Sequence, residues 1–227
     1  GTLVSHPQMI GYRFTASGTQ SSVGSPPLDA IKVLAYADDT LVLLSTPSDM
    51  VALQHTMSLY ERSSNALLNY SKTQAFSLSG VPSPSWLEFL LQLPQPITSW
   101  HDRSSPSALI YLGYPVYSSV VQRNQFIDQL LLKVKTACDI HSSRSLSIRG
   151  RVTVLNTLIF SRLWHVLRAV PLTSTQIQKF QGIGGAILNS YRFPRVSFAT
   201  LCLSRDEGGA GTLDPHIQQL TLQWRWI

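Results

Sequence analysis

The sequence predicts an α+β fold in its first half and an all-α, basic fold in its second half. Short runs rich in β-branched and aromatic residues, bounded by turn-forming residues, predict antiparallel hairpins with a packed helix in the first half. Helical periodicity then replaces them. We therefore expect two domains, covering residues 1–118 and 119–227.

The most informative segment of the first half is Tyr36-Ala37-Asp38-Asp39, which lies between apolar, β-prone runs at 31–35 and 40–44. Such runs are typical of strands, so the acidic pair is expected at the tip of a hairpin. Adjacent carboxylates repel each other, and both ionise at low cost only when they are solvated or share a cation. The pair is either a platform for the divalent metal that nucleotidyl transfer needs, or two Asp residues of an ordinary solvated turn.

Turn residues and periodicity place the other elements of this half. A helix is expected over about 49–64, because Ser48 or Asp49 can cap its first turn. The packed face of this helix is expected to contain Met50, Leu53, Met57 and Tyr60. A Gly/Ser/Pro-rich loop is expected over 15–27. The expected strands cover residues 9–14, 75–78, 97–100 and 108–112, the last two forming a second hairpin.

Three amphipathic helices are expected in the second half. The packed face of the first contains Phe126, Ile127, Leu130, Leu131, Val134 and Cys138. Ser147 can cap a long second helix that reaches Ala169 and is ended by Pro171. Thr173 can cap a third helix, which is weakened by the glycines within 182–185.

The formal net charge of +6 is unevenly distributed along the chain. Residues 1–100 hold four basic against six acidic side chains, a net of −2, and residues 101–227 hold fourteen against six, a net of +8. Between Lys133 and Arg195 the only acid is Asp139. An acidic half beside a basic half suggests a metal site next to a phosphate-binding surface, the alternative being a solvated basic surface without a partner.

Cysteine content and hydropathy exclude several classes of protein. Cys138 and Cys202 are the only cysteines, so no disulfide framework is expected and a reducing compartment is favoured. Cys138 and His141 have the spacing of metal ligands, but without a second pair nearby we expect no zinc site. No apolar run approaches the roughly 18 residues that cross a bilayer, and no leader opens the chain. We expect an intracellular protein without a membrane partner, cut at both ends, since it begins at Gly1 and ends in an apolar stretch.

The order of several segments resembles one family, the reverse transcriptases of non-LTR (LINE-type) retrotransposons. They are similar to the catalytic Asp-Asp segment, the Leu-x-Asn-x-x-Lys-Thr motif, the primer-grip hairpin, the thumb and the Gly-Gly-x-Gly tail of that family. In this chain they are Ala35-Tyr36-Ala37-Asp38-Asp39-Thr40, Asn65 to Thr73, Tyr111-Leu112-Gly113-Tyr114-Pro115, Leu146 to Asn156 and Gly208 to Pro215. The thumb and tail segments distinguish this family from its viral and intron-encoded relatives.

The resemblance implies that residues 1–118 are a partial polymerase palm and residues 119–227 a helical thumb and C-terminal connection. It implies an RNA-directed DNA polymerase that uses two Mg²⁺ ions, an RNA template, a DNA primer and dNTP. Asp38 would be a catalytic carboxylate and metal ligand, with Asp39 assisting it. Lys72 would protonate or stabilise the departing pyrophosphate, the alternative being an exposed lysine at a strand edge.

The family also implies residues that contact the nucleic acid. Tyr36 would pack near the primer terminus, and Leu112 and Gly113 would shape the primer grip. Arginine forks suit phosphate oxygens. The arginines implied for the duplex backbone are Arg144, Arg149, Arg151, Arg162 and Arg168. Positions 144, 151, 162 and 168 do not share one helical face, so some of them must be structural or face solvent.

Two departures from the family pattern limit this interpretation. The palm needs a third carboxylate upstream of the Asp-Asp hairpin, and Asp29 is the only acid before Tyr36. Asn65-Ala66 stands where the family has Ser-Gly. Two hypotheses follow: the chain is a polymerase fragment that is inactive without its missing half, or it is a catalytically inactive remnant that only binds nucleic acid.

Overall fold

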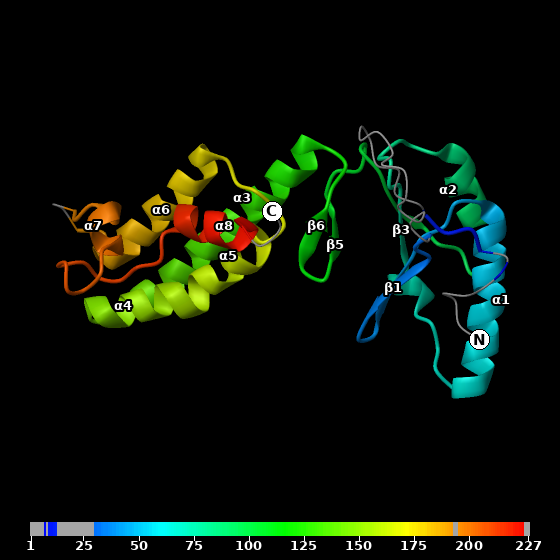
Figure 1. Ribbon diagram of the computed structural model, residues 1–227, viewed down its shortest axis with the longest axis horizontal. Helices are drawn as coiled ribbons and strands as arrows, with labels where there is room; N and C mark the ends of the chain where they lie inside the picture. Colours follow the sequence, from blue (N-terminus) through cyan, green and yellow to red (C-terminus); the bar gives the residue numbers. More distant parts are fainter. Residues whose placement is uncertain (1–6, 8, 13–29, 193–194, 225–227) are drawn as a thin grey trace, which may run out of the picture. The chain divides into compact units, whose positions relative to one another are not determined.

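The computed structural model of the protein describes residues 7, 9–12, 30–192 and 195–224 (Figure 1). The expected loop at 15–27 and Asp29 lie outside the described residues, and of the expected strand at 9–14 only 9–12 are described. The chain forms two compact units. Unit 1 comprises residues 1–75 and 83–100, and unit 2 comprises residues 76–82 and 101–227. The division lies near residue 100, whereas the sequence predicted a boundary after residue 118.

The acidic pair lies at the tip of a hairpin, as predicted. Strands β1 (Val33–Tyr36) and β2 (Asp39–Val42) pair antiparallel. Tyr36 faces Asp39 across the pair, which leaves Ala37 and Asp38 as a two-residue turn. Three of the four β1 residues are exposed, so this strand is open to solvent.

Helix α1 (Pro47–Ser64) begins at a capping box rather than at the predicted cap. The Thr46 hydroxyl accepts a hydrogen bond from the Asp49 N–H at 3.3 Å, and the Asp49 carboxylate accepts one from the Thr46 N–H at 3.2 Å. The prediction of Ser48 or Asp49 as the cap is wrong. Thr46 is the N-cap, and Asp49 occupies the third helical position, where it completes the box.

Asp49 also organises the chain around the start of α1. Its side chain is fully buried and accepts hydrogen bonds from the N–H groups of Ile10, at 3.0 Å, and Ser45, at 2.8 Å. Burial by itself raises the pKa of this carboxyl, but the backbone donors of Ile10, Ser45 and Thr46 outweigh burial and leave its pKa below the ordinary value. The carboxylate, as a charged acceptor, therefore joins the backbone at Ile10 to the start of α1.

The core of unit 1 is small. It forms where α1 meets α2 (Pro84–Leu91) and the segment after it. Its buried members are Met50, Leu90, Leu93 and Ile97. Leu53 packs against this cluster, but Tyr60, predicted on the same helix face, is 56% exposed because the cluster covers only the first turns of α1.

The prediction of a second hairpin between residues 97–100 and 108–112 is wrong. Strand β4 (Ser99–His101) pairs instead with β3 (Gln74–Phe76), and the division between the two units runs through this pair. Strand β3 lies within one residue of the start predicted for it. Three-residue strands carry too little alternation for a sequence pattern to identify their partner.

The hairpin of unit 2 joins β5 (Leu109–Tyr111) to β6 (Tyr114–Val116). It reverses at Leu112 and Gly113, within the segment that resembles the primer grip. Just beyond it, buried Gln122 accepts a hydrogen bond from the Ser118 N–H at 2.8 Å. The same side chain donates to the Asp102 carbonyl at 2.7 Å, so one amide joins the segments on both sides of the hairpin.

The rest of unit 2 is a helical bundle. Ser147 and Thr173 cap the second and third helices as predicted. The predicted long helix is continuous but contains a π-helical segment, η3, and ends at Leu167. In the described part of the chain, no helix combines the length and apolar character needed to span a membrane. The bundle consists of α3 (Val120–Ser142), α4 (Ile148–Val154), η3 (Leu155–Ile159), α5 (Phe160–Leu167) and α6 (Ser174–Leu188).

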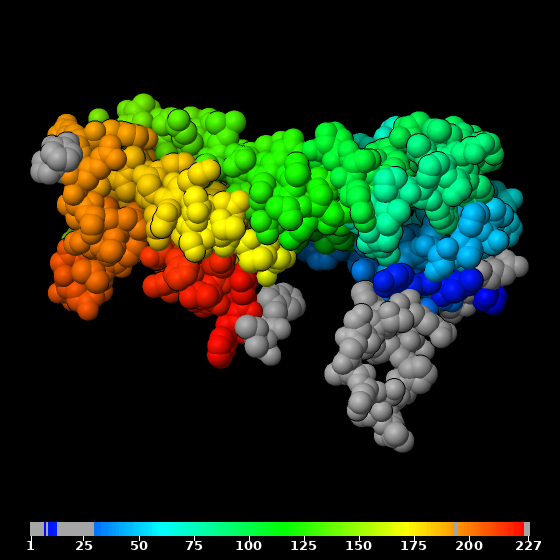
Figure 2. Space-filling model, turned by 90° about the horizontal axis from the view of Figure 1, so that it is seen from above, coloured from blue at the N-terminus to red at the C-terminus, as the bar shows by residue number. Residues whose placement is uncertain are grey.

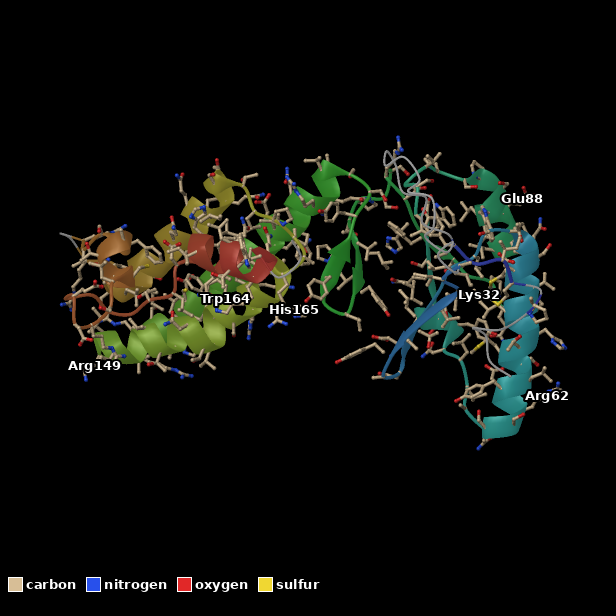
Figure 3. All side chains as sticks on the ribbon, in the orientation of Figure 1. Lys32, Arg62, Glu88, Arg149, Trp164 and His165 are labelled. Carbon is tan, nitrogen blue, oxygen red and sulfur yellow. The ribbon has the colours of Figure 1, made fainter. Side chains whose placement is uncertain are left out.

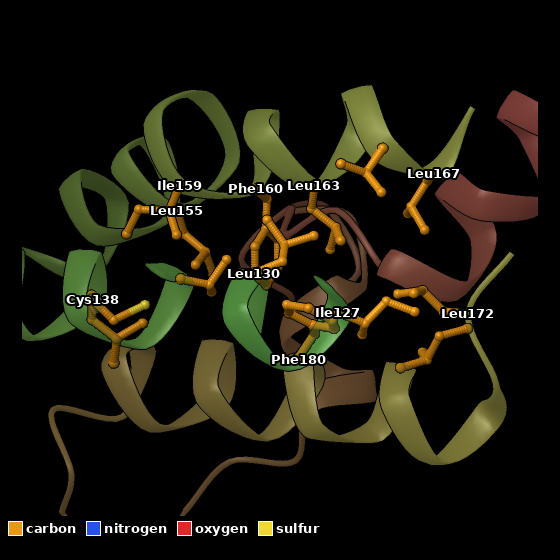
Figure 4. Close-up of a cluster of buried hydrophobic side chains, with 14 of the residues drawn as sticks. Ile127, Leu130, Cys138, Leu155, Ile159, Phe160, Leu163, Leu167, Leu172 and Phe180 are labelled. Carbon is orange, nitrogen blue, oxygen red and sulfur yellow. The ribbon is translucent and has the colours of Figure 1, made fainter. Parts of the chain in front are cut away.

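The faces of these helices meet in one apolar core (Figure 4). Phe160 and Phe180 are completely buried at its centre. Cys138 is buried there too, and burial, together with the charge of Asp139, raises the pKa of its thiol to about 12. In this position the Cys138 thiol packs as a small apolar side chain.

Two glycines of α6, Gly182 and Gly184, have different surroundings. A Cβ at this position would lie 3.0 Å from the Phe160 ring and 3.2 Å from the Phe198 ring. A Cβ at Gly182, one half-turn earlier, would meet nothing within 4 Å. The absence of a side chain at Gly184 therefore lets α6 approach its neighbours closely, while Gly182 only weakens the helix.

The C-terminal tail runs back along the bundle. It contains α7 (Phe198–Cys202), a glycine-rich segment and α8 (Pro215–Gln223). The Asn156 amide, in η3, donates to the Gly211 carbonyl and accepts from the Leu213 N–H, both at 3.1 Å. Buried Gln219 pairs in the same way with both backbone groups of Leu172. Helix α8, red in Figure 2, thus lies against α5 and α6 of unit 2.

We expect Gly184→Ala to be about 1–3 kcal/mol less stable than Gly182→Ala, because the added methyl group overpacks the contact with Phe160 and Phe198. Gly182→Ala is the matched control on the same helix and should stabilise the protein by about 0.5–1 kcal/mol. Urea unfolding followed by helical circular dichroism measures both. Equal stability of the two variants would contradict the packing role of Gly184.

We expect Asp49→Asn to lower the free energy of unfolding at pH 7 by about 1.5–3 kcal/mol, because a charged acceptor of backbone N–H groups is lost. The folded-state pKa is lowered, so the contribution of Asp49 is present above the unfolded pKa of roughly 4 and is lost as pH falls through the folded value. Urea midpoints between pH 2 and pH 7 should show an acid loss of stability that is smaller in the variant. Asp128→Asn, at an exposed position of α3, should leave the pH profile unchanged.

Candidate functional site

The tip of the β1–β2 hairpin presents two carboxylates and an aromatic ring to solvent. Asp38 lies in the turn, Asp39 begins β2, and both are exposed. Directly opposed residues of an antiparallel pair have side chains on the same face, so the Tyr36 ring stands beside Asp39. Tyr36 is 67% exposed, which leaves its ring accessible to a ligand.

The turn that carries Asp38 is strained. Ala37 has a φ of 53°, a backbone region that favours glycine because it brings Cβ close to the next carbonyl. Positive φ at the first central residue alone is typical of a type II′ turn, the kind that matches the twist of hairpin strands. The positive φ of Ala37 costs about 1–2 kcal/mol of conformational free energy. With it, the chain reverses within Ala37 and Asp38.

The donor chemistry of the tip fits magnesium. Mg²⁺ prefers carboxylate and phosphate oxygens in octahedral geometry, and protein sites commonly supply one or two carboxylates while the substrate supplies the rest. Asp38 and Asp39, both exposed, are the carboxylates that the tip could offer to such an ion. Within the described ranges, no three His, Cys, Asp or Glu side chains gather as a metal site. Completion of the coordination sphere therefore needs oxygens from bound phosphates, water or another acidic side chain.

Lys72 ends a compact turn in unit 1 that Asn69 organises. The Asn69 side chain accepts hydrogen bonds from the Lys72 N–H at 3.2 Å and from the Ser71 hydroxyl at 2.7 Å. The Thr73 hydroxyl donates to the Asn69 carbonyl at 3.1 Å. These bonds close the 3₁₀ turn η2 (Tyr70–Lys72) directly before β3 and leave the Lys72 side chain exposed. Among the described residues, no ion pair joins Lys72 to Asp38 or Asp39.

The departure from the family at Asn65 has a structural explanation. Asn65 is the C-cap of α1 with a φ of 57°, and its N–H donates to the Glu61 carbonyl at 3.0 Å. Asparagine tolerates this left-handed conformation better than other residues with a side chain. The helix can therefore end at Asn65 without a glycine.

The second candidate element, the Leu112–Gly113 turn, is held by a histidine that the sequence did not indicate. Both residues have positive φ, 50° and 80°, which is typical of a type I′ turn. The His165 Nε2 lies 3.1 Å from the Leu112 carbonyl oxygen, and its ring stacks on Tyr114 at a centroid distance of 4.2 Å. His165 comes from α5, far along the chain, and is labelled in Figure 3.

The arginines named by the sequence have different surroundings. Arg149 (Figure 3) is exposed in the first turn of α4, and Arg144 is exposed in the segment between α3 and α4. Arg162 and Arg168, further along the chain, are exposed as well. Arg151 instead donates to the carbonyls of Ile187 and Leu188 at 3.2 and 2.9 Å and to the Ser190 hydroxyl. Part of its guanidinium therefore caps the C-terminal end of α6, where a positive charge is favourable.

Comparison with known proteins gives a distant relationship. No model of a known protein family matches the chain. Over 150 residues the chain is 27% identical to the "Transposon TX1 uncharacterized 149 kDa protein" of Xenopus laevis. The matched region is 65% of this chain and 11% of that protein, so the chain spans about a tenth of the relative's length.

We expect Ala37→Gly to stabilise unit 1 by about 0.5–1 kcal/mol, since relief of the positive-φ strain outweighs the extra chain entropy of glycine. Ala35→Gly in the neighbouring strand β1 is the matched control and should destabilise by about 0.5–1 kcal/mol. Thermal unfolding of both variants checks the pair. A loss of stability in Ala37→Gly would show that the turn is unstrained.

Proposed function

We propose that the chain is part of a retroelement reverse transcriptase and that it carries the Asp-Asp hairpin, the primer-grip hairpin and the thumb of that enzyme. The observation that carries the proposal is the acidic pair exposed at the tip of a two-residue hairpin. The compact Asn69 turn and the Leu112–Gly113 hairpin follow it along the chain in the order found in the family. Similarity to a transposon protein supports an origin in a transposable element.

In this proposal the residues of unit 1 serve nucleotidyl transfer. Asp38 and Asp39 would hold Mg²⁺ with their carboxylate oxygens, and Tyr36 would pack beside the primer terminus. Bound Mg²⁺ would supply a lowered pKa for the primer 3′-hydroxyl and charge stabilisation on the phosphate. Lys72 places a positive charge where the leaving pyrophosphate develops its negative charge.

The residues of unit 2 serve binding of the duplex of RNA template and DNA primer. The exposed Leu112–Gly113 turn approaches the primer with its backbone, while His165 occupies the side on which a Gly113 Cβ would stand. Arg144 and Arg149 are exposed and can form paired hydrogen bonds with phosphate oxygens. Arg151 caps the end of α6. Only its guanidinium N–H groups that are not engaged there can donate to phosphate.

A second function is a nucleic-acid-binding remnant without catalysis. It is favoured by the exposed arginines of unit 2, which need no metal to bind phosphate. The two functions share duplex binding and differ in whether the Asp pair does chemistry, so binding and synthesis have to be measured separately.

We expect the 227-residue chain to bind a primer–template duplex with an affinity that falls steeply as salt rises. The double variant Arg144→Ala/Arg149→Ala should lower the slope of log affinity against log salt by about 1.5, because each lost phosphate contact removes roughly 0.7–0.9. Arg62→Ala, an exposed arginine of α1 (Figure 3), is the control and should keep the slope. Fluorescence anisotropy across a salt series measures all three, and a salt-independent affinity would contradict the proposal.

Primer extension with Mg²⁺ and dNTP separates the two functions. The isolated chain should show no synthesis, because two carboxylates do not fix two metals in reactive geometry. Synthesis by the chain that is lost in Asp38→Asn would show instead that the site is complete. Synthesis by a longer polymerase containing this segment, unaffected by Asp38→Asn, would leave only the binding function.

A further inference from the structure

The Leu112–Gly113 turn has an unfavourable sequence for its geometry. Type I′ turns need positive φ at both central residues, and Asn-Gly or Asp-Gly satisfy this best. Here the first position is leucine, with a φ of 50°. Leucine gains no local hydrogen bond in this region as Asn does, so the conformation persists only when contacts around it determine it.

His165 supplies those contacts. Its Nε2 lies 3.1 Å from the Leu112 carbonyl oxygen. Because a carbonyl oxygen only accepts, this hydrogen bond requires the proton on Nε2. A Cβ at position 113 would lie 3.0 Å from the same nitrogen, so glycine lets the histidine approach the turn this closely.

The second contact fixes the ring plane. The imidazole stacks on Tyr114 with a centroid distance of 4.2 Å and an interplanar angle of 29°. Tyr114 is the first residue after the turn and pairs with Tyr111 across the hairpin. His165 is itself exposed, so it does not owe its place to burial in the apolar core. One side chain therefore holds the carbonyl of the turn and the strand that leaves it.

We propose that His165 is a positioning residue that fixes the Leu112–Gly113 turn to α5. The β5–β6 hairpin and α5 then move together as one rigid body. The role of this turn in holding the primer rests on the proposed function, whereas its attachment to α5 does not. The backbone of the turn must keep one conformation to hold a primer end, because small displacements of a binding group cost large factors in rate.

Two variants in the full chain separate the contacts. His165→Phe keeps a ring for Tyr114 and removes the N–H donor, and His165→Gln keeps an N–H donor and removes the ring. Amide hydrogen exchange of Tyr111 and Tyr114 should accelerate about two- to tenfold in each variant, in line with the loss of one modest contact. The matched controls His55→Phe and His55→Gln, at an exposed position of α1, should keep the wild-type exchange rates.

A rescue distinguishes positioning from general loss of stability. Leu112→Asn restores the preferred Asn-Gly turn, which keeps its conformation without outside support. In the His165→Phe background it should return exchange of the hairpin amides toward the wild-type rate. Unchanged exchange in both single His165 variants, or acceleration that spreads to the α3 and α6 amides and is not rescued, would overturn the positioning role.

Duplex binding then tests the link to the primer. His165→Phe should weaken binding of a primer–template duplex about two- to tenfold, in parallel with hairpin exchange. If the wild-type chain binds no duplex while exchange responds as expected, the proposed function fails and the attachment to α5 stands. If the wild-type chain binds and His165→Phe binds equally well, the turn does not serve primer binding and that part of the inference is overturned.

Discussion

The two-residue turns that match the twist of antiparallel strands place at least one central residue at positive φ, and the described hairpins β1–β2 and β5–β6 both use such a turn. In the β1–β2 hairpin the strained residue is Ala37, which sets the direction of the neighbouring Asp38. In the β5–β6 hairpin it is Leu112, which His165 supports from another element. Backbone strain of this kind is concentrated at functional sites, and here it coincides with the two turns to which we assign metal and primer binding.

Hydrogen bonds from polar side chains join separate segments within each unit. Asp49 gathers three backbone N–H groups in unit 1. In unit 2, Gln122, Asn156 and Gln219 each connect segments distant in sequence through both ends of an amide. A neutral amide donates and accepts at once without the desolvation cost of a buried charge, which suits a chain with only 13% charged residues. It also leaves most basic side chains of the bundle exposed, as phosphate binding requires.

Local patterns in the sequence were enough for some elements and not for others. The caps at Ser147 and Thr173 and the acidic hairpin were predictable, because their signals lie within a few residues. The start of α1 was misplaced because Thr46, Ser48 and Asp49 are all plausible caps. The pairing of β4 with β3 and the contact of His165 with Leu112 link residues far apart in the chain, so no local pattern encodes them. The resemblance to the family pointed to the Leu112–Gly113 turn. The contact with His165 that supports this turn is seen only in the structure.

The glycine-rich segment between α7 and α8 determines both the length and the path of the connection between these helices. Gly208 and Gly211 adopt positive φ, and a Cβ on Gly209 would collide with the Leu203 carbonyl, so the segment follows one narrow route to Asn156. One inserted residue would shift Leu213 by roughly 3.5 Å, more than its hydrogen bond to Asn156 tolerates. The tail thus acts as a spacer of defined length between α7 and α8. Insertions and deletions should be least tolerated where the side chains are smallest, contrary to the usual expectation for an exposed, glycine-rich loop.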